Sequence, residues 1–423
     1  MNADKSIQTA GAEAAPKVYH CGTLTYTKAG IFAIFAWLLW GDFCYTLMET
    51  VVPSVLPLKL KALGAPNWLM AMILSTIPSF FNMTICPYIS FKSDRYRSRW
   101  GRRIPFIAAT LPFLCIALVF LGCSEDISLF LQKHMPALSG FAPTTITIAL
   151  IPVFMAVFQF FNMFVSSVFW YLFNDVVPPQ FLSRFVGLFR IVGTGAGALY
   201  NYFIYQYAGT HMREILLGAA ALYFIGFGIV CLVIKEGGYP PVEGEADRDN
   251  KGWGGIRTFF RECFTHKFYW LFFAVTSFAT VVWVINTFNV FFYLEMGLTL
   301  DDVGKISAVG GIFSLVALYF AAIFVDRWHP LRVYVYLRIF IVLTFFSSWV
   351  WLFVTLPGKI FFWLSMAGGL IAAFQGALLG VADLPLYMRL LPKSRYGQFC
   401  SAQSLLRSLC TMIAAVVAGM FID

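Results

Sequence analysis

Long apolar runs follow one another along almost the whole chain. Each is about 18 residues or longer, which is enough for a helix to cross a bilayer core of about 30 Å. The pattern predicts eleven such helices, at residues 29–58, 68–91, 104–123, 145–173, 186–207, 214–234, 269–295, 303–325, 331–355, 360–387 and 397–421. The hydropathy pattern therefore predicts an all-α membrane protein.

Two polar stretches divide this pattern. Residues 1–28 lack the apolar core of a signal peptide, and we expect them to form a cytoplasmic tail. Residues 235–268 carry Gly, Pro and both signs of charge, which is typical of a linker. The predicted organisation is thus an N-terminal bundle of six helices (29–234), a cytoplasmic linker and a C-terminal bundle of five helices (269–423).

Composition and charge agree with a membrane location. The chain is 60% hydrophobic and 12% charged, whereas soluble domains are about 25% charged. The net charge of +9 does not point to nucleic acid, because the cations lie between apolar runs, most densely at residues 92–103. Positive charge concentrates in loops at the cytoplasmic face, so we expect a multi-pass protein of the plasma or inner membrane with a cytoplasmic N-terminus.

The chain shows signs of an internal repeat. The Asp-Arg pair at 94–95 follows the second predicted helix of the first half, and the Asp-Arg pair at 326–327 follows the second helix of the second half. The Ser-Arg pair at 183–184 is likewise echoed at 394–395. Parallel repeats of this kind build transporters from two equivalent bundles. Such a scheme places a twelfth helix after Asp423. The chain is either truncated there, which we expect, or an unusual member with eleven spans.

These motifs carry a resemblance to a known family. Asp94-Arg95 followed by Gly101-Arg102-Arg103 resembles the signature loop of the major facilitator superfamily. The inserted YRSRW and the Pro-Phe after the loop are similar to the sucrose–proton symporter branch and the related glycoside–pentoside–hexuronide transporters. The stretch WGDFCYTLMETVVPSVLPLKLKALG also resembles sucrose-transporter-like carriers of animals. The resemblance implies a major-facilitator fold of two six-helix bundles, and it also covers Asp175, Arg184 and Arg190. Ser90 departs from the family's usual Gly.

Two carboxylates of the first helix are candidates for proton or substrate binding. Asp42 and Glu49 are seven residues apart, so both project from nearly the same helix face. Ionisable groups at membrane depth are costly and usually face a cavity or a partner. Burial disfavours the charged form of a carboxyl group, so one of them could take up and release protons. The alternative is that Glu49 is simply hydrated near the outer rim.

Other polar residues inside the predicted helices extend this candidate site. Arg190 needs a counter-charge or hydroxyl groups unless it reaches the membrane surface. Amides and one further carboxylate recur at helical spacing, and a hydroxyl-rich ligand would need such groups. An alternative role for the amides is hydrogen bonding between helices. The remaining candidates are Gln159, Asn162, Asn286, Asn289, Gln375 and Asp383. The GTGAG run at 193–197 is predicted to be a helix-packing seam rather than a nucleotide-binding loop.

The charged loop residues are candidates for a gate. An Asp at a helix C-terminus is unfavourable against the helix dipole unless another element pairs with it. We expect such pairs to form only while the cytoplasmic side is closed. The candidates are Asp94, Arg95, Arg102, Arg103, Asp175, Arg184, Asp326, Arg327 and Arg395. An alternative is that these charges only fix the orientation of the helices in the membrane. That role would explain the Lys and Arg residues of the loops but not the recurring Asp.

The sequence thus predicts a monomeric secondary transporter that imports a sugar or glycoside with a proton by alternating access. The sugar follows from the resemblance alone. Alternatives are a carrier of another solute (a lysolipid, a sugar acid or a drug), with sodium as another coupling ion, and a transport-inactive membrane sensor. No catalytic motif, metal-ligand spacing or disulfide framework is present in the sequence, so we expect neither an enzyme nor a cofactor.

Overall fold

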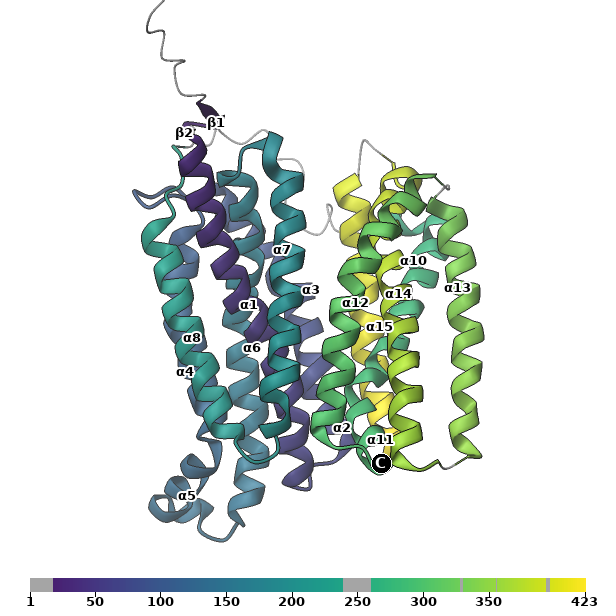
Figure 1. Ribbon diagram of the computed structural model, residues 1–423. Helices are drawn as coiled ribbons and strands as arrows, with labels where there is room; N and C mark the ends of the chain where they lie inside the picture. The colour runs from purple at the N-terminus through teal and green to yellow at the C-terminus, as the bar shows by residue number, and fades with distance from the viewer. Residues whose placement is uncertain (1–17, 239–259, 328–329, 355, 393–395) are drawn as a thin grey trace, which may run out of the picture.

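A computed structural model describes residues 18–238, 260–327, 330–354, 356–392 and 396–423. The helices before the predicted linker gather in one bundle and those after it in a second bundle beside the first (Figure 1). The first bundle holds α1 (Lys28–Ala62), α2 (Asn67–Ala71), α3 (Ile77–Arg95), α4 (Ile104–Gly122), α5 (Ser124–His134), α6 (Pro143–Val176), α7 (Pro179–Leu199) and α8 (Met212–Val233). The second holds α10 (Lys267–Val281), α11 (Asn289–Glu295), α12 (Leu300–Arg327), α13 (Pro330–Ser347), α14 (Gly358–Leu390) and α15 (Tyr396–Ile422).

Short irregular helices interrupt several of these elements. Two π-helical turns, η1 (Met72–Thr76) and η3 (Tyr200–Ile204), join α2 to α3 and extend α7. The 3₁₀ segment η6 (Val282–Phe288) joins α10 to α11, and the other 3₁₀ segments are η2 (Pro136–Leu138), η4 (Tyr205–Tyr207) and η7 (Ser348–Leu352). Such breaks often mark hinges or functional positions in a helix.

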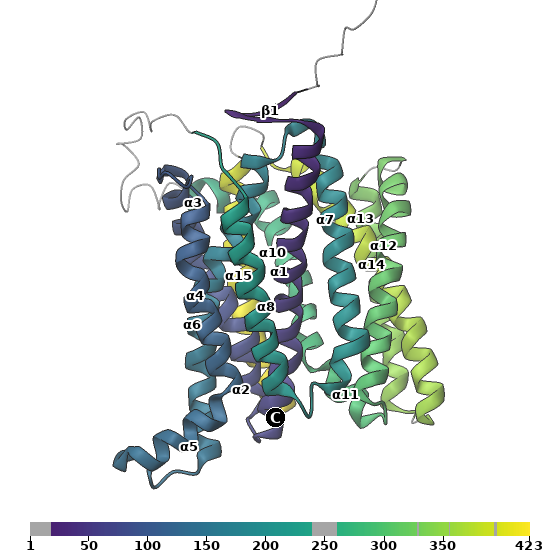
Figure 2. The same cartoon turned by 60° about the vertical axis from the view of Figure 1, so that its left-hand side comes forward.

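The predicted spans are largely confirmed. Ten helices of the described part are long and apolar enough to cross a membrane. The fifth predicted span, 186–207, corresponds to α7, η3 and η4, which are not among the ten. Arg190 and the glycines of the GTGAG run lower the apolar content of α7, yet it runs the length of its bundle beside α1 (Figures 1 and 2).

Local sequence signals set the helix ends. The Thr27 hydroxyl accepts a hydrogen bond from the Gly30 amide at 3.2 Å and caps α1. Proline stands in the first turn of α4, α6 and α7, where its missing N–H costs nothing. Gly64 (φ +74°) and Gly297 (φ +86°) adopt the left-handed conformation just after α1 and α11 and turn the chain into the next element.

The described contacts between the two bundles concentrate toward one end of the molecule. We call this the closed end; it holds the end of α1, the start of α2, the start of α12 and the end of α15. Thr76 donates to the Met412 carbonyl at 3.1 Å, and Gly419 lies against the backbone of Asn67 and Trp68. The charged loop 96–103 lies at the other end, which we call the motif end (Figure 1).

A small N-terminal hairpin covers the motif end of the first bundle. Its strands, β1 (Tyr19–Cys21) and β2 (Leu24–Tyr26), pair antiparallel. The Cys21 thiol donates to the Asp175 and Val177 carbonyls at 3.5 Å each. Burial, and secondarily the nearby Asp175 charge, raises the pKa of Cys21, so the thiol stays protonated and keeps this donor role. The hairpin was not predicted, because residues 1–28 were interpreted as a tail.

Candidate functional site

Asp42 is fully buried in α1, at the contact between α1 and α7. Its Oδ1 accepts a hydrogen bond from the Thr46 hydroxyl at 3.3 Å, while Oδ2 has no partner among the described residues. Gly193 of α7 lies directly against it: a Cβ at this glycine would stand 3.2 Å from Asp42 Oδ2 and 3.0 Å from Thr46 Oγ1. The GTGAG run is therefore a packing seam, as predicted, and it brings the α7 backbone close to the carboxylate.

Glu49 contacts a different helix from Asp42. Its Oε1 accepts a hydrogen bond from Asn162 Nδ2 at 2.8 Å, and Asn162 is almost fully buried in α6. Gln159, one turn earlier on α6, is also buried. The structure thus joins two of the predicted residues in one hydrogen bond, and the Asn162 carbonyl oxygen has no described partner.

Arg190 lies one turn before Gly193 on α7. Its side chain is exposed, and no ion pair joins it to a carboxylate within the described part of the chain. Gly193, one turn further along α7, is the residue that packs against Asp42. Arg190 and Asp42 thus belong to the two helices of one seam, without a direct ion pair between them.

A cavity of about 540 Å³ opens between α1, α3 and α6, and we call it the N-terminal cavity. Its lining combines aromatic rings with hydroxyl and amide groups, including Tyr45, Ser79, Asn82, Ser166, Trp170 and Tyr171. Aromatic faces and neutral polar groups are the surfaces that hydroxylated ring compounds need. The predicted residues Gln159 and Asn162 belong to the same helix, α6, but do not line this cavity.

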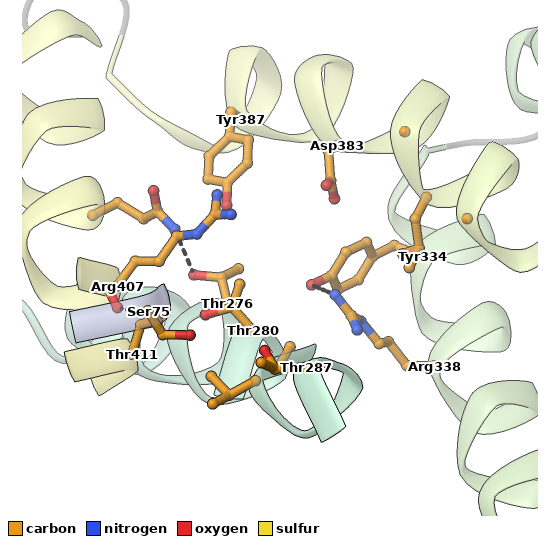
Figure 3. Close-up of a pocket in the computed structure, with 16 residues that line it drawn as sticks. Ser75, Thr276, Thr280, Thr287, Tyr334, Arg338, Asp383, Tyr387, Arg407 and Thr411 are labelled. Atoms are coloured by element: carbon orange, nitrogen blue, oxygen red, sulfur yellow. Dashed lines mark hydrogen bonds between the residues drawn. The ribbon is translucent and has the colours of Figure 1, made fainter. Parts of the chain in front are cut away.

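A second cavity, of about 550 Å³, lies mainly in the second bundle and is drawn in Figure 3. We call it the C-terminal cavity. Asp383 of α14 points into it, between Tyr334 on one side and Tyr387 on the other (Figure 3). Arg338 of α13 and Arg407 of α15 line opposite sides. Gln375 does not line this cavity. Its Nε2 donates a hydrogen bond to the Thr344 hydroxyl at 3.0 Å, which joins α14 to α13.

A third cavity, of about 570 Å³, lies between the two bundles near the closed end. Asn286 and Asn289 line it together with Tyr293, and Asn289 Nδ2 donates to Asn286 Oδ1 at 3.0 Å. Thr287 lines both this cavity and the C-terminal cavity. The 3₁₀ segment η6 thus presents polar side chains to two adjoining spaces.

At the motif end, two predicted gate arginines converge on one predicted gate carboxylate. Arg102 and Arg103 each donate from Nε to Asp175 Oδ2 at 2.9 Å, and Arg102 makes a further short contact to Oδ1. Arg103 also donates to Ser93 at 2.6 Å and lies over the Tyr171 ring, 5.0 Å from its centroid. The loop 96–103 is thus held against α6 within the first bundle.

Glu236 completes this cluster and was not predicted from the sequence. Its carboxylate accepts hydrogen bonds from the amides of Arg102, Arg103 and Ile104 at 2.7–2.9 Å. An acidic group at this position satisfies the free N–H groups of the α4 N-terminus and suits its dipole. Gly101, with φ +103°, has no room for a side chain beside Glu236. Glu236 was overlooked because it belongs to the stretch interpreted as a linker.

The structure gives no described pairing for the other predicted gate residues. Arg184 is exposed at the start of α7. The side chains of Asp94, Arg95, Asp326, Arg327 and Arg395 lie outside the described residues, so their role remains a prediction.

At the closed end, Asp423 joins the two bundles. Its carboxylate accepts hydrogen bonds from the Asn67 amide at 2.7 Å and the Trp68 amide at 3.1 Å, at the N-terminus of α2. These backbone hydrogen bonds, first of all that from Asn67, lower the pKa of Asp423. The contact is therefore fully present near neutral pH and weakens only as the pH falls through this lowered pKa.

We expect Asp423→Ala to favour opening at this end. The variant removes the two hydrogen bonds that tie the N-terminus of α2 to the end of α15, so the contact between the bundles weakens. Spin labels at Ala62 and Glu295, one on each side of the closed end, should show a larger population of long distances by double electron–electron resonance. An unchanged distance distribution would mean that Asp423 does not hold this end closed.

Sequence comparison decides the family. The model of the Major Facilitator Superfamily matches residues 134–415, which is more than half of the chain. The chain belongs to the Major Facilitator Superfamily. A search of curated protein sequences finds no significant match.

Solved structures show the same fold at low sequence identity. A bacterial homologue of the human lysosomal transporter Spinster, inward-facing and unoccupied, has a TM-score of 0.64 at 14% identity, over 93% of this chain and 83% of that one. A D-xylose–proton symporter has a TM-score of 0.63 at 12% identity, over 92% and 90%. The nucleoside transporter NupG gives 0.60 at 13% identity, over 92% and 90%.

This member of the superfamily is a multi-pass membrane transporter of a small molecule, and it is not an enzyme. The superfamily and Asp383 were predicted from the sequence, whereas Arg338 and Arg407 were not. Both arginines lie in apolar helices. Ionisable residues at membrane depth usually face a cavity or a partner, and this argument, which selected Asp42, applies to them equally. They were overlooked because no motif of the resemblance includes them.

Proposed function

We propose that this transporter imports a sugar or glycoside together with a proton, by alternating access, with its N-terminus in the cytoplasm. The observation that carries the proposal is the buried Asp42 carboxylate at the α1–α7 seam, which has one oxygen without a described partner. A carboxyl group at membrane depth favours the protonated form and can exchange that proton when its surroundings change.

The cavities support a hydroxylated solute. The N-terminal cavity offers rings, hydroxyls and amides, and the cavity near the closed end offers Asn286, Asn289 and Tyr293. Neutral donors and acceptors of this kind can replace the water around sugar hydroxyls. The symporter of D-xylose among the structural neighbours shows that this fold accommodates a sugar and a proton.

The arrangement of contacts supports alternating access. The described contacts between the bundles gather at the closed end, and the cation-rich loop lies at the other end. If cation-rich loops face the cytoplasm, this is an inward-facing state. The pairs of Arg102 and Arg103 with Asp175 are then formed while the cytoplasmic side is open, contrary to the expectation that such pairs form only when it is closed. They join residues of the first bundle only, so we propose that they fix the loop 96–103 rather than latch the two bundles together.

Uptake into proteoliposomes tests the proposal. Labelled sugars and glycosides should accumulate when an inward proton gradient is imposed, and accumulation should disappear when an uncoupler removes that gradient. Replacing sodium with potassium on both sides should leave uptake unchanged. Accumulation that follows sodium instead of the pH gradient would contradict proton coupling, and no uptake of any sugar would contradict the substrate class.

A further inference from the structure

The C-terminal cavity contains more charge than a neutral sugar requires. Arg338, Asp383 and Arg407 line it from three different helices, and Asp383 points into the space between the two arginines (Figure 3). No ion pair within 4 Å joins these three side chains, all of which belong to the described part. Charged groups at membrane depth normally pair with each other or face a functional cavity, so their separation indicates that the space between them is a binding site.

Each arginine keeps donor groups free for a ligand. Arg338 Nη2 donates to the Tyr334 hydroxyl at 2.9 Å, and its guanidinium lies 4.8 Å from the centre of that ring. Its Nε is buried without a hydrogen-bond partner in the described structure. Arg407 is exposed toward the cavity. The tyrosine therefore orients Arg338 while part of its planar donor fork remains open.

The balance of charge selects the sign of the ligand. Asp383 points into the space between the two arginines, so its ionised carboxylate offsets one of their two positive charges. One positive charge then remains at membrane depth, and a neutral solute would leave it there. A single negative charge on the solute would neutralise the cavity. A guanidinium binds oxyanions especially well, because its planar N–H groups match the two oxygens of a carboxylate or phosphate.

The rest of the lining suits a hydroxylated compound. Thr276 and Thr280 of α10 face the same space, with Tyr387 opposite them (Figure 3). Gln403 Nε2 donates to the Thr276 hydroxyl at 3.5 Å. Ser75 of η1 reaches the cavity from the first bundle. A solute held here would thus contact both bundles, as a substrate of alternating access must.

We propose that the C-terminal cavity binds the oxyanion of a monoanionic sugar derivative, with Arg407 and Arg338 as its ligands and Asp383 as their counter-charge. This inference rests on the proposed function and narrows its substrate class. The oxyanion could be a carboxylate or a phosphate. A phosphate monoester carries a charge between −1.5 and −2 at neutral pH, so the charge balance favours the carboxylate.

Matched pairs of solutes test the inference. The probes are labelled glucose and gluconate, lactose and lactobionate, and glucose 6-phosphate, each offered to proteoliposomes under the same inward proton gradient. We expect gluconate or lactobionate to enter at least tenfold faster than its neutral partner, and glucose 6-phosphate to enter more slowly than gluconate. Arg407→Gln should lower uptake of the acid about tenfold, and Arg407→Lys should restore it only in part.

Arg332→Gln is the matched control, because Arg332 is an exposed cation of the same helix as Arg338 and does not line the cavity. It should leave uptake unchanged. A second readout is the Tm of the detergent-purified protein, which gluconate or lactobionate should raise for the native chain and not for Arg407→Gln. This comparison also shows whether the variant is folded.

The outcomes separate the inference from the proposed function. Uptake of glucose or lactose that equals or exceeds that of the acids overturns the oxyanion site and leaves sugar transport standing. Faster entry of glucose 6-phosphate than of gluconate retains the oxyanion site and overturns the preference for a monoanion. If none of the five probes enters and none raises the Tm, both proposals fail. If Arg407→Gln does not fold, the native protein's relative rates of uptake of the sugar acids and the neutral sugars still test the oxyanion site.

Discussion

Asp42→Asn should abolish uphill accumulation of substrate while leaving exchange of substrate across the membrane intact. The amide keeps the shape of the side chain and its contact with Thr46, but it cannot bind and release a proton. Because Gly193 packs against this position, a change of size would disturb the seam, so the isosteric amide isolates the loss of titration. The measurement is accumulation in proteoliposomes under an imposed pH gradient, together with equilibrium exchange of labelled substrate.

Asp126→Asn provides the control for this experiment. Asp126 pairs with Arg213 at 2.8 Å, but both side chains are more than half exposed, and such surface pairs contribute little. This variant should accumulate substrate as the native protein does. If Asp42→Asn still concentrates substrate in response to pH, Asp42 is not the coupling group, and Glu49 or Asp383 becomes the next candidate.

The second large effect is expected for Asp175→Asn. Asp175 is the shared partner of Arg102 and Arg103, whose side chains are 19% and 5% exposed. Removing one partner of a buried ion pair leaves an uncompensated charge and costs about 3 kcal/mol. We expect a lower Tm for the purified protein and a lower rate of uptake, because the loop 96–103 loses its attachment to α6.

Asp301→Asn is a suitable comparison for Asp175→Asn. Asp301 pairs with Lys305 within α12, and both side chains are more than one-third exposed. This variant should melt close to the native Tm. Native melting and native uptake for Asp175→Asn would contradict a structural role for the cluster and would leave its arginines as topology anchors only.

Hydropathy could determine the membrane-spanning helices because the signal is local. Moving a residue from water to lipid has a free energy that depends mainly on that residue, so a run of apolar residues such as 104–123 defines its own span. The same reasoning identified Asp42 and Asp383 as ionisable residues inside apolar helices, where their cost at membrane depth indicates a functional role. It was least informative for α7, where Arg190 and several glycines weaken the apolar signal of a helix that still runs beside α1.

Contacts between distant residues could not be predicted in this way. Gly193 meets Asp42 across about 150 residues of sequence, and Glu236 caps α4 from more than 130 residues away. Which helix faces meet depends on the packing of whole helices, and single-residue propensities do not contain that information.

The sequence by itself therefore determined the membrane class, the helices and the superfamily loop, since each rests on local composition or on a contiguous motif. Only the tertiary structure decided which charges meet. It placed Asp175 between two arginines, left Arg338 and Arg407 facing Asp383 across a cavity, and closed the molecule at the end where Asp423 caps α2. Electrostatic interactions depend on separation and on burial, and both are properties of the folded chain.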